Sequence, residues 1–113
     1  MADRSTEVVD IGSIPSASGV WQRCRGLIGA DSERVSKGLA LPHCQSVHTF
    51  GMRVSLDLIF VDRGRRILRV CRDVPPGRLV WGGLRVSTVL ELAAGDARNL
   101  GLEPGCKVRW RDC

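Results

Sequence analysis

The 113-residue chain contains no tyrosine, and lysine supplies only two of its 17 basic residues. It also lacks any run of roughly 20 apolar residues, the length that a membrane-spanning helix needs. We therefore expect no membrane span. The first seven residues hold two acidic side chains and no apolar run, which predicts that no export signal is present and favours a cytoplasmic location.

Three familiar motifs are missing as well. The chain has no Gly-x-Gly-x-x-Gly fingerprint, no Gly-x-x-x-x-Gly-Lys loop and no Gly-x-Ser-x-Gly elbow. These absences argue against a dinucleotide-binding protein, a nucleoside triphosphatase and a serine hydrolase. We expect no cofactor.

The cysteines are odd in number, scattered along the chain and without a Cys-x-x-Cys pair: Cys24, Cys44, Cys71, Cys106 and Cys113. This pattern argues against a disulfide framework and a zinc ribbon, and free thiols fit a reducing cytosol. The spacing of His43, Cys44 and His48 would allow a metal half-site or a cysteine nucleophile beside a base. Because these residues supply at most three ligands, we expect no metal site. We favour Cys44 as a core residue, with the nucleophile as the alternative.

Hydrophobic residues make up 43% of the chain and charged residues 26%, which predicts a folded single domain over residues 1–113. Short apolar segments separated by glycine and proline predict a mainly β fold. We expect a compact β-sandwich or partly closed barrel of about seven or eight short strands with one or two short helices. An α+β fold is the alternative.

The strands are expected over residues 8–11, 39–41, 46–50, 56–61, 66–71, 78–81, 86–92 and 106–110. The clearest hairpin signal joins the fourth and fifth of these through the turn 62–65. Apolar residues at helical spacing predict a helix over 18–29, which would bury Trp21. Residues 30–37 are expected to form a polar loop, and residues 95–100 one helical turn.

Three polar residues stand inside otherwise apolar strands. Period-2 alternation puts Asp57 on the face of Ile59 and Val61, and it puts Glu91 on the face of Val89. A buried carboxylate needs hydrogen-bond donors or a counter-charge. One interpretation is that Asp57 or Glu91 pairs with His48 and fixes its tautomer; the other is that each carboxylate ties down a neighbouring loop through backbone N–H groups.

The net charge of +5 attracts anions, and five arginines lie close together: Arg63, Arg65, Arg66, Arg69 and Arg72. Strand alternation divides them between two faces, and no aromatic residue lies among them for base stacking. A solvated hairpin is therefore favoured over a nucleic-acid surface. Trp81, before two glycines, is the best candidate for an exposed binding aromatic.

Four motifs then occur in a fixed order: Arg25-Gly26-Leu27, His48-Thr49-Phe50-Gly51-Met52, Leu56-Asp57-Leu58-Ile59-Phe60 and Val89-Leu90-Glu91-Leu92. In this combination the chain resembles a bacterial and archaeal family known as domain of unknown function 192. The resemblance implies a compact, mainly β domain with a core over about residues 8–110, and it implies no reaction. Two positions depart from the family pattern, namely Ser55, where proline is frequent, and Cys106, where aspartate is common. Many relatives also begin with an export signal or lipid anchor, which is not visible here.

These features favour a small cytosolic binding or accessory module, expected to be a monomer, with an unidentified protein or small-molecule partner. Its recognition residues are predicted to be His48, Thr49, Phe50, Gly51, Met52 and Trp81. The first alternative is an enzyme with His48 as acid or base, oriented by Asp57 or Glu91, and with Cys44 as the nucleophile. The second is weak nucleic-acid binding through the arginines.

Overall fold

The structure is a computed structural model that describes residues 4–17 and 26–113. Strands dominate these residues, which confirms the predicted mainly β fold. The strands are β1 (Val8–Ile14), β2 (Leu39–Pro42), β3 (Ser46–His48), β4 (Leu56–Val61), β5 (Ile67–Val74), β6 (Leu79–Trp81), β7 (Thr88–Ala93) and β8 (Lys107–Asp112). Two short helices accompany them, α2 (Ser32–Ser36) and α3 (Asp96–Leu100).

The central element is an antiparallel sheet in the order β2-β7-β4-β5. The predicted hairpin of β4 and β5 is confirmed, and the Asp62 carboxylate stabilises its turn by accepting the N–H groups of Gly64 and Arg66. All six residues of β4 are buried, because both faces of the sheet are covered.

The two faces of the sheet support separate apolar clusters. Leu58, Phe60 and Val89 pack into one cluster, while Ile59 and Leu90 pack into the other. Successive strand residues point to opposite faces, so neighbours in the sequence contribute to different clusters. The alternation assigned to β4 and β7 from the sequence is therefore confirmed.

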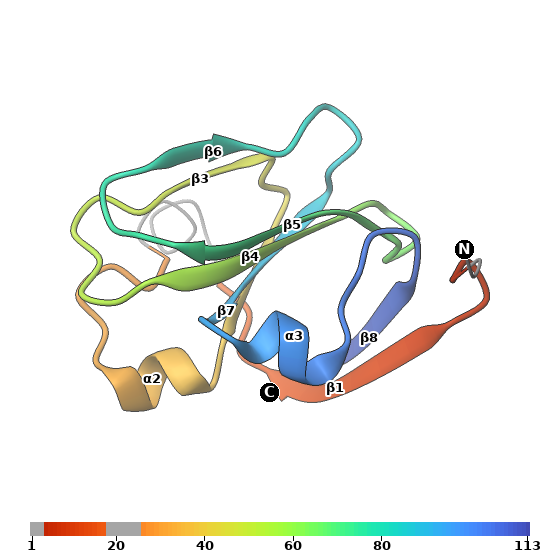
Figure 1. Cartoon of the computed structure of the whole chain (residues 1–113), viewed down its shortest axis with the longest axis horizontal. Helices are drawn as coiled ribbons and strands as arrows, with labels where there is room; N and C mark the ends of the chain where they lie inside the picture. Colours follow the sequence, from red (N-terminus) through yellow and green to blue (C-terminus); the bar gives the residue numbers. More distant parts are fainter. Residues whose placement is uncertain (1–3, 18–25) are drawn as a thin grey trace.

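A second sheet covers the face of Ile59 and Leu90. It consists of the parallel pair β1 and β8, which run side by side in Figure 1. Val108 and Trp110 of β8 pack in the same cluster as Ile59. Isolated bridges join this pair to its neighbours, Ser16 to Ala40 and Arg66 to Lys107, and the sheets do not close into a barrel.

A third sheet, the antiparallel pair β3 and β6, belongs to the cluster of Leu58 and Phe60 through Val47 and Val80. Figure 1 shows this pair apart from β1 and β8, with the central strands between them. Gly82, directly after β6, allows close approach to the sheet, because a Cβ atom there would overlap the ring of Phe60.

The structure corrects one loop prediction and one helix prediction. The loop expected over 30–37 contains α2, because the Asp31 side chain caps this helix by accepting the Arg34 N–H at 2.9 Å, and Val35 is buried. The helix expected over 18–29 falls on residues 18–25, including Trp21, which lie outside the described residues. Residues 26–29 form turns, so the helix does not extend to Gly29.

Candidate functional site

An open pocket of about 1130 Å³ lies on the β3–β6 side of the molecule. Its walls come from β3, β6, the loop 84–87 that leads into β7, and the β4–β5 turn at 62–64. Glu91 of β7 and Gly26 also line it. Segments far apart in the sequence therefore contribute to one cavity.

Glu91 supplies a buried carboxyl group to this pocket. Only 2% of the residue is exposed, and its Oε1 atom has no hydrogen-bond partner among the residues that the structure describes. Burial raises the pKa of the Glu91 carboxyl to about 7, while a backbone hydrogen bond from Leu27 lowers it. The group therefore changes charge near neutral pH.

The Gly26–Leu27 turn holds the Glu91 carboxyl. Gly26 has a φ of +54°, and a Cβ atom added there would overlap Glu91 Oε1. Only glycine gives both the left-handed backbone and the room for the carboxyl group. The motif Arg25-Gly26-Leu27 carried part of the family resemblance, but the contact of Gly26 and Leu27 with Glu91 joins residues too distant in sequence for strand alternation to reveal.

His48 ends β3 and lines the same pocket. Its side chain is half-buried, its Nδ1 atom has no hydrogen-bond partner among the described residues, and its ring stacks on Phe50 with centroids 5.6 Å apart. In the tautomer that carries its proton on Nε2, Nδ1 is a hydrogen-bond acceptor. Within the described part of the chain, the pocket therefore has two buried polar atoms that lack partners, one on Glu91 and one on His48.

His43 and Cys44 also line the pocket. Cys44 is half-buried and packs against the core cluster, whereas His43 is exposed. Among the residues that the structure describes, no group of three or more His, Cys, Asp or Glu side chains could hold a metal ion.

The pocket rim is apolar and exposed. Leu79 is 71% exposed, Trp81 58% and Leu84 80%. Trp81 is thus the exposed aromatic that the sequence predicted. Leu84 and Leu79 were not predicted, because an isolated leucine in a β sequence gives no sign that it faces solvent.

Asp57 lies away from the pocket. Its Oδ1 accepts the Asp73 N–H at 2.8 Å, and its Oδ2 accepts the N–H groups of Gly95 and Ala97 at 3.1 and 2.9 Å. Asp57 is 1% exposed, and these amides satisfy its buried charge. Of the two interpretations offered by the sequence, Asp57 follows the one in which the carboxylate accepts backbone N–H groups, but these groups belong to β5 and to the first turn of α3 rather than to a loop.

The motif from His48 to Met52 divides between surface and interior. Phe50 and Gly51 are exposed, whereas Thr49 and Met52 are buried. The Thr49 hydroxyl donates to the Pro75 carbonyl at 2.7 Å and accepts the Arg78 N–H at 2.8 Å. Thr49 therefore fastens the segment between β5 and β6 to the end of β3.

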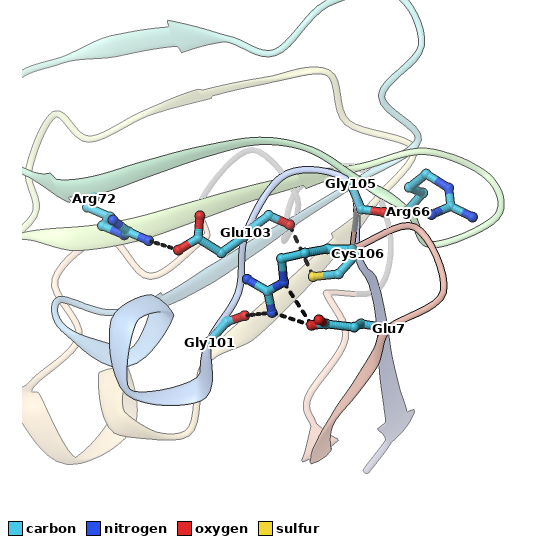
Figure 2. A network of polar contacts seen from close by, with 8 residues as sticks. Glu7, Arg66, Arg72, Gly101, Glu103, Gly105 and Cys106 are labelled. Atoms are coloured by element: carbon cyan, nitrogen blue, oxygen red, sulfur yellow. Dashed lines mark hydrogen bonds and ion pairs between the residues drawn. The ribbon is translucent and has the colours of Figure 1, made fainter. Parts of the chain in front are cut away.

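Most of the clustered arginines bind other parts of the chain. Arg65 stacks over the Trp110 ring at 3.6 Å and donates to its carbonyl, and Arg69 donates to the Trp81 carbonyl. Figure 2 shows Arg72 paired with Glu103 and Arg66 beside the Gly105 carbonyl. These contacts spread the guanidinium groups over separate neighbours, as expected for a structural role of the hairpin.

The fold and pocket define a small, mainly β domain with an open cavity above its central sheet. The family profile of DUF192, described as "Uncharacterized ACR", matches residues 3–110. The chain therefore belongs to the family called domain of unknown function 192, as its motifs indicated.

Two solved structures are similar. A protein of unknown function from Novosphingobium aromaticivorans has a TM-score of 0.73 and 25% identity, over 84% of this chain and 72% of that one. A proposed transcription regulator from Sinorhizobium meliloti has a TM-score of 0.73 and 22% identity, over 83% and 78%. The second likeness concerns the fold alone. No curated protein matches the chain significantly.

Among the described residues, no helix is long and apolar enough to cross a membrane, and this includes both α2 and α3.

Proposed function

We propose that this chain is a cytoplasmic, monomeric binding module whose site is the pocket lined by Glu91, His48 and Trp81. The observation that carries the proposal is Glu91 Oε1, which lies on the wall of an open cavity and has no hydrogen-bond partner within residues 4–17 and 26–113. Removing a polar group from water without a hydrogen bond is costly. A ligand that offers a donor to this atom would recover that cost.

The apolar rim supports the same proposal. Ligand pockets combine apolar walls with a few well-placed polar groups. Here Leu79, Trp81 and Leu84 supply exposed apolar surface, and Glu91 with His48 supplies the polar atoms. Within the predicted motif, we assign ligand contact to His48, and we assign positioning roles to Thr49 and Met52 because both are buried.

An enzyme is the second candidate function, because Glu91, His48 and Cys44 line one pocket. In that case His48 would act as the acid or base and Cys44 as the nucleophile. Iodoacetamide distinguishes this candidate: a nucleophilic Cys44 is alkylated faster at neutral pH than the exposed Cys113. An equal or slower rate at Cys44 removes the nucleophile from consideration.

Nuclear magnetic resonance on ¹⁵N-labelled protein tests the binding proposal, with benzamide and indole as neutral probes. We expect shifts clustered at the amides of Val47, His48 and Val86. Trp81→Ala and His48→Ala should weaken binding at least fivefold and keep the fold. Val8→Ala, which removes an exposed apolar side chain of β1, is the control and should bind as wild type.

Two results would contradict the proposal. The first is an absence of shifts at the pocket, or shifts of equal size at β1 and α3. The second is a collapse of thermal stability in His48→Ala together with unchanged probe binding in Trp81→Ala, since His48 would then be structural and the rim would not contact a ligand.

A further inference from the structure

Glu91 and its surroundings indicate which class of ligand the pocket accepts. We propose that the pocket binds a small molecule carrying an amidinium, guanidinium or ammonium group, with the cation on Glu91 and an apolar part against Trp81. This inference rests on the proposed function and deepens it by naming the chemistry of the ligand.

The first argument is the missing counter-charge. The ion pairs among described residues join Arg4 to Glu7, Arg72 to Glu103, and both Arg109 and Arg111 to Asp10. None of them includes Glu91, although Glu91 is nearly fully buried. Buried carboxylates are retained in proteins when a cation or several donors meet them. Glu91 Oε1 has no partner in the described part of the chain, and the pocket beside it leaves room for a cation from outside the chain.

The second argument is the chemistry of the neighbouring atoms. His48 Nδ1 has no partner in the part of the chain that the structure describes, and in a neutral imidazole it accepts a hydrogen bond when Nε2 carries the proton. Two acceptors on one cavity favour a ligand rich in N–H donors. A planar amidinium or guanidinium matches a carboxylate with two parallel hydrogen bonds, and aromatic faces such as that of Trp81 attract cations and apolar groups alike.

The residues directly opposite Glu91 on the neighbouring strands are uncharged. Its register partners are Leu39 in β2 and Leu58 in β4, and the Gly26–Leu27 turn meets it from a third side. Among the described residues, the other ionisable groups that line the pocket are His43, Cys44, His48, Asp62, Arg63 and Arg85. Arg63 and Arg85 are both exposed to solvent. Solvent screens their positive charge, so they repel an entering cation less strongly than a buried arginine would.

Three probes of nearly equal size test the inference: benzamidine, benzamide and benzoate. At pH 8 we expect the wild-type protein to bind benzamidine at least tenfold more tightly than benzamide, and benzoate least tightly. Because the pKa of Glu91 is about 7, lowering the pH to 6 should weaken benzamidine binding about tenfold, since a protonated carboxyl no longer attracts the cation. Benzamide binding should change little.

Glu91→Gln is the decisive variant, because it keeps the size of the side chain and removes its charge. We expect it to lose the preference for benzamidine and to retain benzamide binding. Glu103→Gln removes an exposed carboxylate outside the pocket and serves as the matched control, with wild-type selectivity.

The outcomes separate the inference from the proposed function. If benzamide binds and benzamidine gains no advantage, or if Glu91→Gln keeps the advantage, the cation assignment is wrong and the binding module stands. Tighter binding of benzoate would also overturn it and point to the exposed arginines. If none of the three probes binds, both proposals fail.

Discussion

Asp57 and Glu91 lie on adjacent strands of one sheet and point to opposite faces. Asp57 of β4 is the register partner of Leu92, and Glu91 of β7 is the partner of Leu58. Alternation places Asp57 with Ile59 on the face covered by β1 and β8, and Glu91 with Val89 on the face of the pocket. Asp57 therefore cannot orient His48, and Glu91 is the acid that shares its cavity.

Asp57→Asn should destabilise the fold. The carboxylate accepts three backbone N–H groups, one from β5 and two from the start of α3, and an amide side chain would turn an N–H donor toward one of them. We expect a loss of about 2–4 kcal/mol in the free energy of unfolding, measured in urea. Asp10→Asn, at an exposed carboxylate, should cost less than about 0.5 kcal/mol. Equal effects of the two substitutions would contradict a tethering role for Asp57.

Glu91→Gln should alter how stability depends on pH. The pKa of Glu91 is raised from 4.5 to about 7 in the folded chain, so the folded state binds the proton more tightly than the unfolded state. The resulting stability is present below pH 4.5 and is lost as the pH rises through 7, by up to roughly 3 kcal/mol.

Thermal melts of wild type and Glu91→Gln between pH 4.5 and 8 provide the measurement. The wild type should lose stability relative to the variant over this range, because the glutamine cannot ionise. Glu103→Gln controls for the loss of an ordinary exposed carboxylate. Parallel stability curves for wild type and Glu91→Gln would show that Glu91 ionises as easily in the folded chain as in the unfolded one.

Gly26→Ala should cost more than Gly29→Ala. Both glycines have positive φ, +54° and +75°, so alanine is strained at either position. An added Cβ atom overlaps Glu91 Oε1 at Gly26 but meets nothing within 4 Å at Gly29. We expect about 1 kcal/mol of destabilisation at Gly29 and about 2–3 kcal/mol at Gly26, measured by urea unfolding.

A double variant tests the cause of that difference. Shortening the acid in Gly26→Ala/Glu91→Ala removes the overlap, so the two substitutions should cost less together than the sum of their separate effects. Strict additivity would mean that the Gly26 turn and Glu91 do not interact.

Thr49→Val should loosen the β3–β6 pair. The substitution keeps the shape of the side chain but removes the hydroxyl that bridges Pro75 and Arg78, so the partly buried Pro75 carbonyl and Arg78 N–H lose this partner. We expect about 1–3 kcal/mol of destabilisation and faster hydrogen exchange at the Arg78 amide. Thr49→Ser retains the hydroxyl and should keep the exchange rate near that of wild type. Unchanged exchange in Thr49→Val would exclude this anchoring role.

Local patterns were enough to predict most strands. The alternation in 56–61, the turn 62–65 and the run 66–71 indicated β4, β5 and their hairpin, because register and turn chemistry act over few residues. The same alternation assigned Asp57 and Glu91 to the correct neighbours on their strands. The prediction of a loop over 30–37 was wrong because α2 is only five residues long and lies in a polar stretch, so too few residues carried a helical pattern.

The sequence by itself determined the mainly β class, the family and the burial of two acids within apolar strands, since period-2 alternation and motif order are properties of the chain alone. Only the tertiary structure decided what each acid meets. Strand order sets which face of the sheet a loop covers, so the amides of Asp73, Gly95 and Ala97 reach Asp57, while Gly26 and the pocket reach Glu91. These contacts join residues from 16 to 40 positions apart at Asp57, a separation over which no local pattern fixes a partner.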